Sequence, residues 1–303
     1  MNIINIKGNS FFARGGTNTG IYLFDDNSAL IIDPGLPGVR PRNLMKYFDE
    51  NGIIPKWIIN THEHNDHYGA GYQFKEKYKD IVNMSSEFSK IYIDNPVLFS
   101  SYIMGGETNA IFDKILLNKN MEQVKIDEVI KEGKININNE YIEVISLVGH
   151  TIGSIGIMTK DKVLYLGDTL IGEELLNKFE LLFLYDIEEY LKSLDKVKYL
   201  DFEYCVLGHC KRPITKESTL ELISKHEENV NEYLKQVKTI AKEPSTLEYI
   251  LKTIINDNEL SYNYKEYHFF RSTLVGMISY LIKLGDIDCQ LKNGDVLYYT
   301  KQL

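Results

Sequence analysis

One short segment of the chain concentrates side chains that bind metals. Three of the seven histidines in 303 residues fall in it together with an aspartate, as His62, His64, Asp66 and His67. They directly follow the apolar run 57–59, which is typical of a strand end. Imidazole and carboxylate are the ligand types expected for zinc, iron or manganese, and metal pairs about 3.5–4 Å apart recur in hydrolytic sites. A single loop histidine is commonly just solvated, but four such groups at this spacing predict a metal site.

Further ligands must come from other parts of the chain, because one loop cannot close two coordination spheres. Three candidates stand out: His150, Asp168 and His209. Each follows a β-rich run and a glycine, and glycine lets the backbone turn sharply and approach an ion. We therefore expect several strand ends to meet at one site.

Five short motifs occur in a fixed order along the chain. They are I-D-P-G at 32–35, T-H-x-H-x-D-H at 61–67, G-H-T at 149–151, G-D-T at 167–169 and G-H at 208–209. Together they resemble the successive metal motifs of the metallo-β-lactamase fold superfamily, in its glyoxalase II-like branch, over roughly residues 15 to 212. The resemblance implies a mixed α/β fold, a four-layer αββα sandwich.

The resemblance also implies two divalent metal ions and their ligands. The ligands would be His62, His64 and His150 on one ion, Asp66, His67 and His209 on the other, and Asp168 bridging both. Asp33 would orient the site through hydrogen bonds, although a polar strand-ending turn explains Asp33 equally well. Zinc is the expected metal, with iron or manganese as alternatives. Cys210 is interpreted as a packed or surface cysteine, because this ligand set is complete without sulfur.

The predicted activity follows from this metal pair. Two cations lower the pKa of a water held between them, and the resulting metal-bridged hydroxide would attack a polarised carbonyl. Asp66 would accept a hydrogen bond from it and later carry a proton to the leaving group. The sequence therefore predicts a hydrolase of esters, thioesters or related small acyl substrates. Two alternatives stay open: a nuclease or phosphodiesterase acting on RNA, and a persulfide dioxygenase with one iron.

The composition of the chain limits which molecules it is expected to bind. The net charge of −9 disfavours broad adhesion to nucleic acid or anionic lipid, although a local basic patch could still occur. No apolar run approaches the roughly 20 residues of a membrane span, and the N-terminus has no secretory pattern. The three cysteines form no disulfide framework. We expect a cytoplasmic enzyme with a small-molecule substrate, and a homodimer is left open.

Hydrophobic patterning predicts the elements that must position the site. Residues 1–214 are expected to form the catalytic domain, whose elements are a hairpin over 18–33, helices at 42–48, 68–78 and 187–199, and strands around 53–60, 124–167 and 204–207. The segments 85–118, as a helical insertion, and 169–183 are expected to shape the pocket.

Residues 215–303 are predicted to form a separate tail of three helices and a hairpin at Asn293-Gly294, with a winged helix as one form it could take. This tail holds 11 Lys/Arg and 13 Asp/Glu, whereas phosphate contacts favour a basic face. The apolar stripe at 269–278 fits core packing better than a partner surface.

Overall fold

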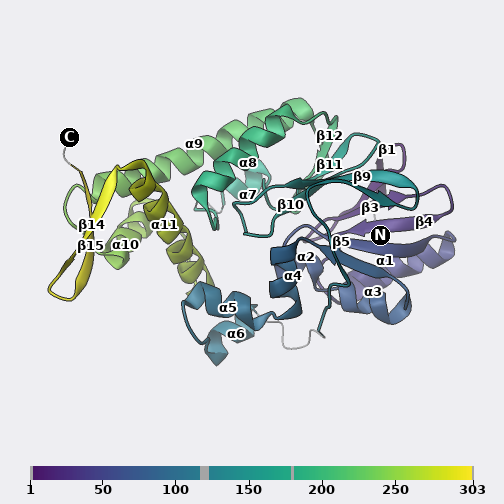
Figure 1. Ribbon diagram of the computed structural model, residues 1–303, viewed down its shortest axis with the longest axis horizontal. Helices are drawn as coiled ribbons and strands as arrows, with labels where there is room; N and C mark the ends of the chain where they lie inside the picture. The colour runs from purple at the N-terminus through teal and green to yellow at the C-terminus, as the bar shows by residue number, and fades with distance from the viewer. Residues whose placement is uncertain (1–2, 117–122, 179–180, 302–303) are drawn as a thin grey trace.

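Two β-sheets stacked face to face form a sandwich at one end of the molecule, in a computed structural model that describes residues 3–116, 123–178 and 181–301 (Figure 1). The first sheet has seven strands in chain order: β1 (Ile3–Lys7), β2 (Ser10–Ala13), β3 (Thr19–Leu23), β4 (Ser28–Ile32), β5 (Ile54–Asn60), β6 (Val82–Ser85) and β7 (Glu128–Val129). The second has six strands in the order β13-β12-β11-β10-β9-β8: β8 (Gly133–Ile137), β9 (Glu140–Ser146), β10 (Ile155–Met158), β11 (Val163–Tyr165), β12 (Tyr204–Val206) and β13 (Ile214–Thr215).

Alternation along the strands explains how the sheets stack, because successive side chains point to opposite faces. In β4, Leu30 and Ile32 face the second sheet and join its Val144 and Ile157 in one buried cluster. Ile31 points the other way, into a cluster with helix side chains. A strand buried on both faces is what a layered sandwich requires.

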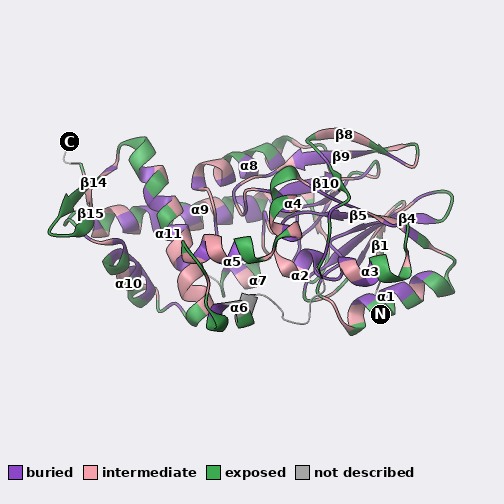
Figure 2. Cartoon of the chain, turned by 60° about the horizontal axis from the view of Figure 1, so that its bottom comes forward, coloured by how far each residue is buried: buried purple, intermediate pink, exposed green. Residues whose placement is uncertain are grey.

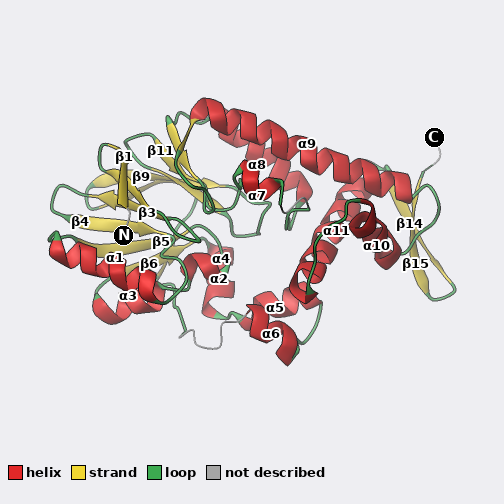
Figure 3. Ribbon diagram, turned by 180° about the vertical axis from the view of Figure 1, so that it is seen from behind, coloured by secondary structure: helices red, strands yellow, loops and turns green. Residues whose placement is uncertain are grey.

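Helices cover both outer faces of the paired sheets (Figure 3). Helices α1 (Val39–Glu50) and α3 (Gly71–Lys77) pack on the first sheet through side chains such as Leu44, Phe48 and Phe74. Helices α8 (Ile187–Tyr199) and α9 (Lys216–Ile240) pack on the second. The predicted αββα sandwich is therefore confirmed.

The helix expected at 68–78 differs from the prediction, because the chain breaks there. Helix α2 (Asn65–Tyr68) ends before α3 begins at Gly71. The backbone between them bonds to Gly35 instead: Gly35 N–H donates to His67 O at 2.8 Å and Ala70 N–H donates to Gly35 O at 2.7 Å. This bonding fixes α2, which carries two of the predicted ligands, against the turn after β4.

The insertion predicted at 85–118 is helical up to residue 116, and its last two residues lie outside the described part. It contains α4 (Glu87–Asp94), α5 (Val97–Met104) and α6 (Ala110–Leu116). Ser86 caps α4 by accepting from Ser89 N–H at 3.2 Å. A short helix, α7 (Glu173–Leu176), lies in the second predicted pocket segment.

The tail contains α10 (Leu247–Asp257), α11 (Tyr264–Leu284) and the hairpin of β14 (Ile287–Lys292) and β15 (Asp295–Thr300). Asn293 and Gly294 have φ values of 54° and 90°, as a two-residue hairpin turn requires. Ser245, between α9 and α10, pairs with Tyr298 of β15. The order of elements from α9 onward is a helix, a single paired residue, two helices and a hairpin. This is the element order of a winged helix.

The tail and the sandwich share helix α9 and one continuous apolar cluster (Figure 1). The predicted boundary at residue 215 coincides with the N-cap of α9, Thr215, and stays a prediction. Along α11 the apolar stripe is buried, including Phe270, Leu274 and Ile278, so the prediction that it packs in the core is confirmed. The hairpin, in contrast, is largely exposed (Figure 2). Among the described residues no helix is long and apolar enough to cross a membrane.

Candidate metal centre

The seven predicted ligands lie together at one edge of the sandwich, each just beyond a strand. The strand order explains this: β5 runs parallel to β4, and β12 runs parallel to β11, so their carboxyl ends meet at the same edge. The ligand atoms fall into two groups, each within 4.8 Å: His62, His64, His150 and Asp168, and Asp66, His67 and His209. The grouping matches the two predicted ligand sets.

The first group has the spacing of a tetrahedral site. His150 Nε2 lies 3.1 Å from His64 Nδ1. Asp168 Oδ2 lies 4.0 Å from His62 Nε2 and 3.9 Å from His150 Nε2. Ligands about 2.0–2.2 Å from a tetrahedral zinc ion are roughly 3.3–3.6 Å from one another. The three histidines and the carboxylate therefore need only small shifts to hold one ion.

The second group shares the Asp168 carboxylate. His209 Nε2 lies 3.3 Å from both Asp66 Oδ2 and Asp168 Oδ2. His67 Nε2 lies 3.7 Å from Asp66 Oδ2 and 3.3 Å from Asp168 Oδ1. Because Asp168 Oδ2 approaches nitrogen atoms of both groups, the carboxylate is placed between them.

Several of these atoms are buried without a hydrogen-bond partner. Among the described residues, His62 Nε2, His67 Nε2 and Asp168 Oδ1 accept or donate no hydrogen bond. Leaving a buried polar group unsatisfied costs about 1–3 kcal/mol, so such groups need an explanation. The donor types, their convergence and their missing partners fit a pair of divalent cations.

Electrostatics differ between the two groups. Burial lowers the pKa of His62 and of His64, so both imidazoles stay neutral. Burial also acts to lower the pKa of His67, but Asp168, Asp33 and Asp66 outweigh it and raise this pKa to about 10. Asp168 chiefly raises the pKa of His209 to about 12. In the metal-free protein the second group therefore holds protons that a cation must displace.

Asp33 contacts the second group directly. Its Oδ2 lies 2.8 Å from His67 Nδ1, and both carboxylate oxygens accept from Thr61, Oδ1 from the backbone N–H and Oδ2 from the hydroxyl, each at 2.7 Å. With its proton on Nδ1, His67 presents the Nε2 lone pair to the site. Asp33 has a left-handed φ of 54°, which aspartate tolerates better than most residues.

The glycines before His209 and His150 permit close packing of the backbone. A Cβ on Gly208 would lie 2.2 Å from Asp168 Oδ1, and Gly149 has a φ of 142° and touches the Tyr190 backbone. Cys210 Sγ lies 3.3 Å from Asn18 Nδ2 and 3.5 Å from Leu207 O.

Comparison with known proteins identifies the family. Residues 13–209 match the metallo-beta-lactamase superfamily. The chain belongs to this superfamily. It is 24% identical over 261 residues to a hydroxyacylglutathione hydrolase of Prochlorococcus marinus (strain MIT 9312), covering 83% of this chain and 89% of the relative. A probable metallo-hydrolase of Bacillus subtilis (strain 168) is 29% identical over 151 residues, or 49% of this chain and 64% of the relative. The chain is a hydrolase of this superfamily.

Solved structures of the superfamily share the whole fold, tail included. A beta-lactamase domain protein from Burkholderia ambifaria superposes with a TM-score of 0.75 at 14% identity, covering 99% of this chain and 94% of that one. A metallo-beta-lactamase family protein of Thermus thermophilus gives a TM-score of 0.71 at 17% identity, with 94% of each chain covered. At these identities the likeness concerns the fold alone.

Main-chain carbonyls hold two of the predicted ligands, and the sequence gives no sign of these contacts. Gly16 O accepts from His209 Nδ1 at 2.6 Å, and Phe183 O accepts from His150 Nδ1 at 3.0 Å. The hydroxyl of Thr17 donates to Asp66 Oδ2 at 2.8 Å. These contacts orient three predicted ligands from two loops that carry no motif.

Arg40 of α1 fixes the loop that contains Gly16 and Thr17. Its guanidinium donates to Ala13 O at 2.6 Å, Arg14 O at 3.3 Å and Thr19 Oγ1 at 3.0 Å. Burial lowers its pKa. A cation partly removed from water and bonded to neutral acceptors is unusual at a surface, which points to a positioning role.

Glu63, inside the histidine motif, is also buried. It accepts from Ser89 Oγ and Thr151 Oγ1, each at 2.8 Å, and thereby joins the motif to α4 and to the loop that follows His150. Burial raises its pKa. The predicted insertion also reaches the site, since the ring of Phe99 in α5 lies 5.0 Å from that of His64.

Proposed function

We propose that the chain hydrolyses esters, thioesters or related small acyl compounds with two divalent metal ions, zinc being the proposed metal. The proposal rests chiefly on the convergence of seven ligand atoms in two groups around one carboxylate. The relatives named hydroxyacylglutathione hydrolase, a thioester-cleaving activity by name, support the substrate class. The three free cysteines agree with the cytoplasm as the proposed compartment.

Cations bound in the two groups would lower the pKa of a water molecule and polarise the substrate carbonyl. The chain supplies the rest of the chemistry. His62, His64 and His150 stay neutral and offer nitrogen lone pairs. Asp66 Oδ2, which Thr17 Oγ1 orients, faces the site and can accept a proton from water. The same oxygen can then pass that proton to the departing alkoxide or thiolate, so that one C–O bond forms while the ester or thioester bond breaks.

The nuclease alternative finds little support in the tail. Helix-turn-helix proteins place a recognition helix in the major groove, and here the helix before the hairpin is α11. This helix packs against α5, α6 and α8 of the catalytic part, with the ring of Phe269 6.3 Å from that of Phe99 (Figure 1). The packed face of α11 is therefore not free for nucleic acid, and the balance of 11 Lys/Arg against 13 Asp/Glu in residues 215–303 disfavours phosphate contacts.

Metal content and a substrate panel test the proposal together. Elemental analysis of purified protein should give about two ions per chain, and the panel should contain thioester, lactone, phosphodiester and β-lactam substrates. We expect hydrolysis of thioesters or esters that chelators abolish and zinc restores. Cleavage of phosphodiesters alone would favour the nuclease, and oxygen consumption with a persulfide would favour the dioxygenase.

A further inference from the structure

The cavity beside the metal centre has a volume of about 970 Å³ and two chemically different ends. His150, Asp168 and His209 lie along its inner side. Pockets that bury drug-sized ligands measure roughly 300–1,000 Å³, so this cavity is near the upper limit. A two- or three-carbon acyl group alone would leave most of the volume to water.

One end of the cavity is an apolar wall made by residues 181–184 with Phe269 and Phe270 of α11. The Phe183 and Phe269 rings lie 4.8 Å apart, and the Phe183 ring meets the His150 ring edge to face at 5.7 Å. Phe183 also binds His150 through its carbonyl. The apolar wall therefore begins directly beside the first ligand group.

Helix α11 holds this wall in place. The hydroxyl of Thr273, which is fully buried, donates to Leu182 O at 2.9 Å and accepts from Leu184 N–H at 3.0 Å. Two bonds from one side chain align the segment with the helix. The tail thus contributes both apolar surface and its support to the cavity.

The other end of the cavity is lined by charged groups of both signs, and two of its acidic residues, Glu173 and Glu174, already pair with Lys225 and Lys211. Arg14 and Arg212 line it and are exposed, and among the described residues no carboxylate lies within 4.0 Å of either guanidinium. Arg14 belongs to the loop whose Gly16 O holds His209, and Arg212 follows His209 by three residues. Unpaired arginines at a cavity mouth are suited to carboxylate or phosphate.

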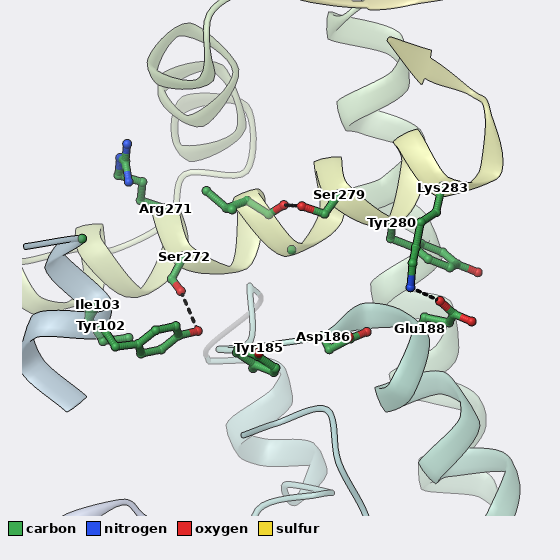
Figure 4. A pocket seen from close by; sticks show the side chains of 13 residues that line it. Tyr102, Ile103, Tyr185, Asp186, Glu188, Arg271, Ser272, Ser279, Tyr280 and Lys283 are labelled. Carbon is green, nitrogen blue, oxygen red and sulfur yellow. Dashed lines mark hydrogen bonds and ion pairs between the residues drawn. The ribbon is translucent and has the colours of Figure 1, made fainter. Parts of the chain in front are cut away.

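A second hollow, of about 450 Å³, lies on the far side of the same segment, between α5 and α11 (Figure 4). Two pairs of its polar groups bond to each other: Lys283 bonds Glu188 at 2.6 Å, and Tyr102 Oη lies 3.4 Å from Ser272 Oγ. None of the predicted metal ligands lines it. The substrate therefore belongs in the cavity beside the metal centre.

We propose that this cavity selects anionic thioesters with a bulky apolar acyl chain, and that α11 sets this selectivity. The acyl chain lies on the apolar wall, and the anionic thiol portion lies toward Arg14 and Arg212. Asp66 is on the His209 side, where the departing thiolate would receive its proton. The inference rests on the proposed thioester hydrolysis and adds to it which acyl groups and thiols are accepted.

Binding of inert analogues tests the apolar wall. We would titrate metal-loaded protein with S-alkyl thioethers of coenzyme A, from ethyl to octyl, in a calorimeter. Each added methylene should lower Kd by up to about fourfold. Phe269→Ser should flatten this dependence, Phe269→Leu should preserve it, and the control Phe88→Ser, at an exposed position of α4, should leave it unchanged. A Kd independent of chain length, or an equal slope in Phe269→Ser and Phe88→Ser, would overturn the proposal.

Matched thiols test the role of Arg14 and Arg212. Octyl thioethers of coenzyme A, glutathione and neutral N-acetylcysteamine offer phosphate, carboxylate and no anion. Arg14→Gln and Arg212→Gln should each weaken the favoured anionic analogue about tenfold and spare the neutral one, with Arg42→Gln in α1 as control. The tighter of the two anionic analogues identifies the anion. Equal affinity for all three thiols would refute that role.

Hydrolysis of the corresponding thioesters separates the two proposals. Length-dependent binding of the thioethers, without hydrolysis of any thioester or of the matching esters, would refute the proposed function and leave the cavity assignment standing. Hydrolysis at equal kcat/KM for every chain length would refute the cavity assignment alone.

Discussion

Asp33→Asn tests whether the carboxylate behind His67 prepares the second ligand group. The substitution keeps the shape of the side chain and suits the left-handed backbone, so Thr61 N–H can still bond to the amide oxygen. The amide NH₂ then faces His67 Nδ1, which must become an acceptor and move its proton to Nε2. Losing such an outer contact typically weakens metal binding 10–100-fold, or about 1.4–2.7 kcal/mol.

The assay is a metal titration against a competing chelator, with both binding constants fitted. In Asp33→Asn we expect the affinity of the weaker of the two metal-binding steps to fall 10–100-fold, while the affinity of the other step changes little. Asp26→Asn is the matched control, because Asp26 precedes β4 and Asp33 follows it. Within the described part of the chain, Asp26 bonds to Ser28, Lys56 and Asn138, none of which is a predicted ligand. Two unchanged constants in Asp33→Asn would refute the orienting role.

Three further predictions concern metal loading and stability. Arg40→Met should loosen the loop that holds His209, so elemental analysis should show the metal content fall from about two ions per chain toward one. Arg40→Lys should restore the metal content only partly, because lysine lacks the planar fork of donors. Two ions per chain in Arg40→Met would contradict this prediction. Because the pKa values of His67 and His209 are raised, protons compete with the second metal ion. The apparent affinity for this ion should therefore fall by up to about 100-fold for each unit by which the pH is lowered from 8.5 to 6.5, and calorimetry in two buffers should detect proton release on binding. A pH-independent affinity would contradict this prediction. Burial lowers the pKa of His226 to about 4, whereas the unfolded chain has the ordinary histidine pKa of about 6.5. The stability contributed by neutral His226 is therefore fully present above pH 6.5. Up to about 3 kcal/mol of the free energy of unfolding is lost as the pH falls toward 4. Urea unfolding of metal-free protein should show this loss, reduced in His226→Gln, and an equal pH slope in both would exclude His226 as the cause.

The clustering of the seven predicted ligands could be expected from the sequence because each follows a strand, and three of them, His150, Asp168 and His209, directly follow a glycine. Strand ends in a sandwich share an edge, so motifs far apart in the chain, such as those at His150 and His209, meet without long-range information. The role of Asp33, which follows β4, was expected from the resemblance to the superfamily, and its contacts with His67 and Thr61 agree with that expectation. The layered fold followed from short alternating strands between helices.

Other features depend on tertiary contacts that leave no local pattern. Every residue has a main-chain carbonyl, so no residue type reveals the roles of Gly16 O and Phe183 O. In the sequence, Arg40 looks like an ordinary surface residue of a helix. The break between α2 and α3 arises because Gly35, some 30 residues earlier, takes the backbone bonds. The apolar wall joins segments about 90 residues apart, and only the fold brings them together.

The central claim, that seven side chains hold two metal ions, is tested most directly by diffraction data collected on either side of the zinc absorption edge. We predict two anomalous peaks about 3.5–4 Å apart. One should lie among His62, His64 and His150 and the other among Asp66, His67 and His209, with Asp168 between them. A single peak, or peaks bound by other residues, in crystals grown with excess zinc would contradict the claim.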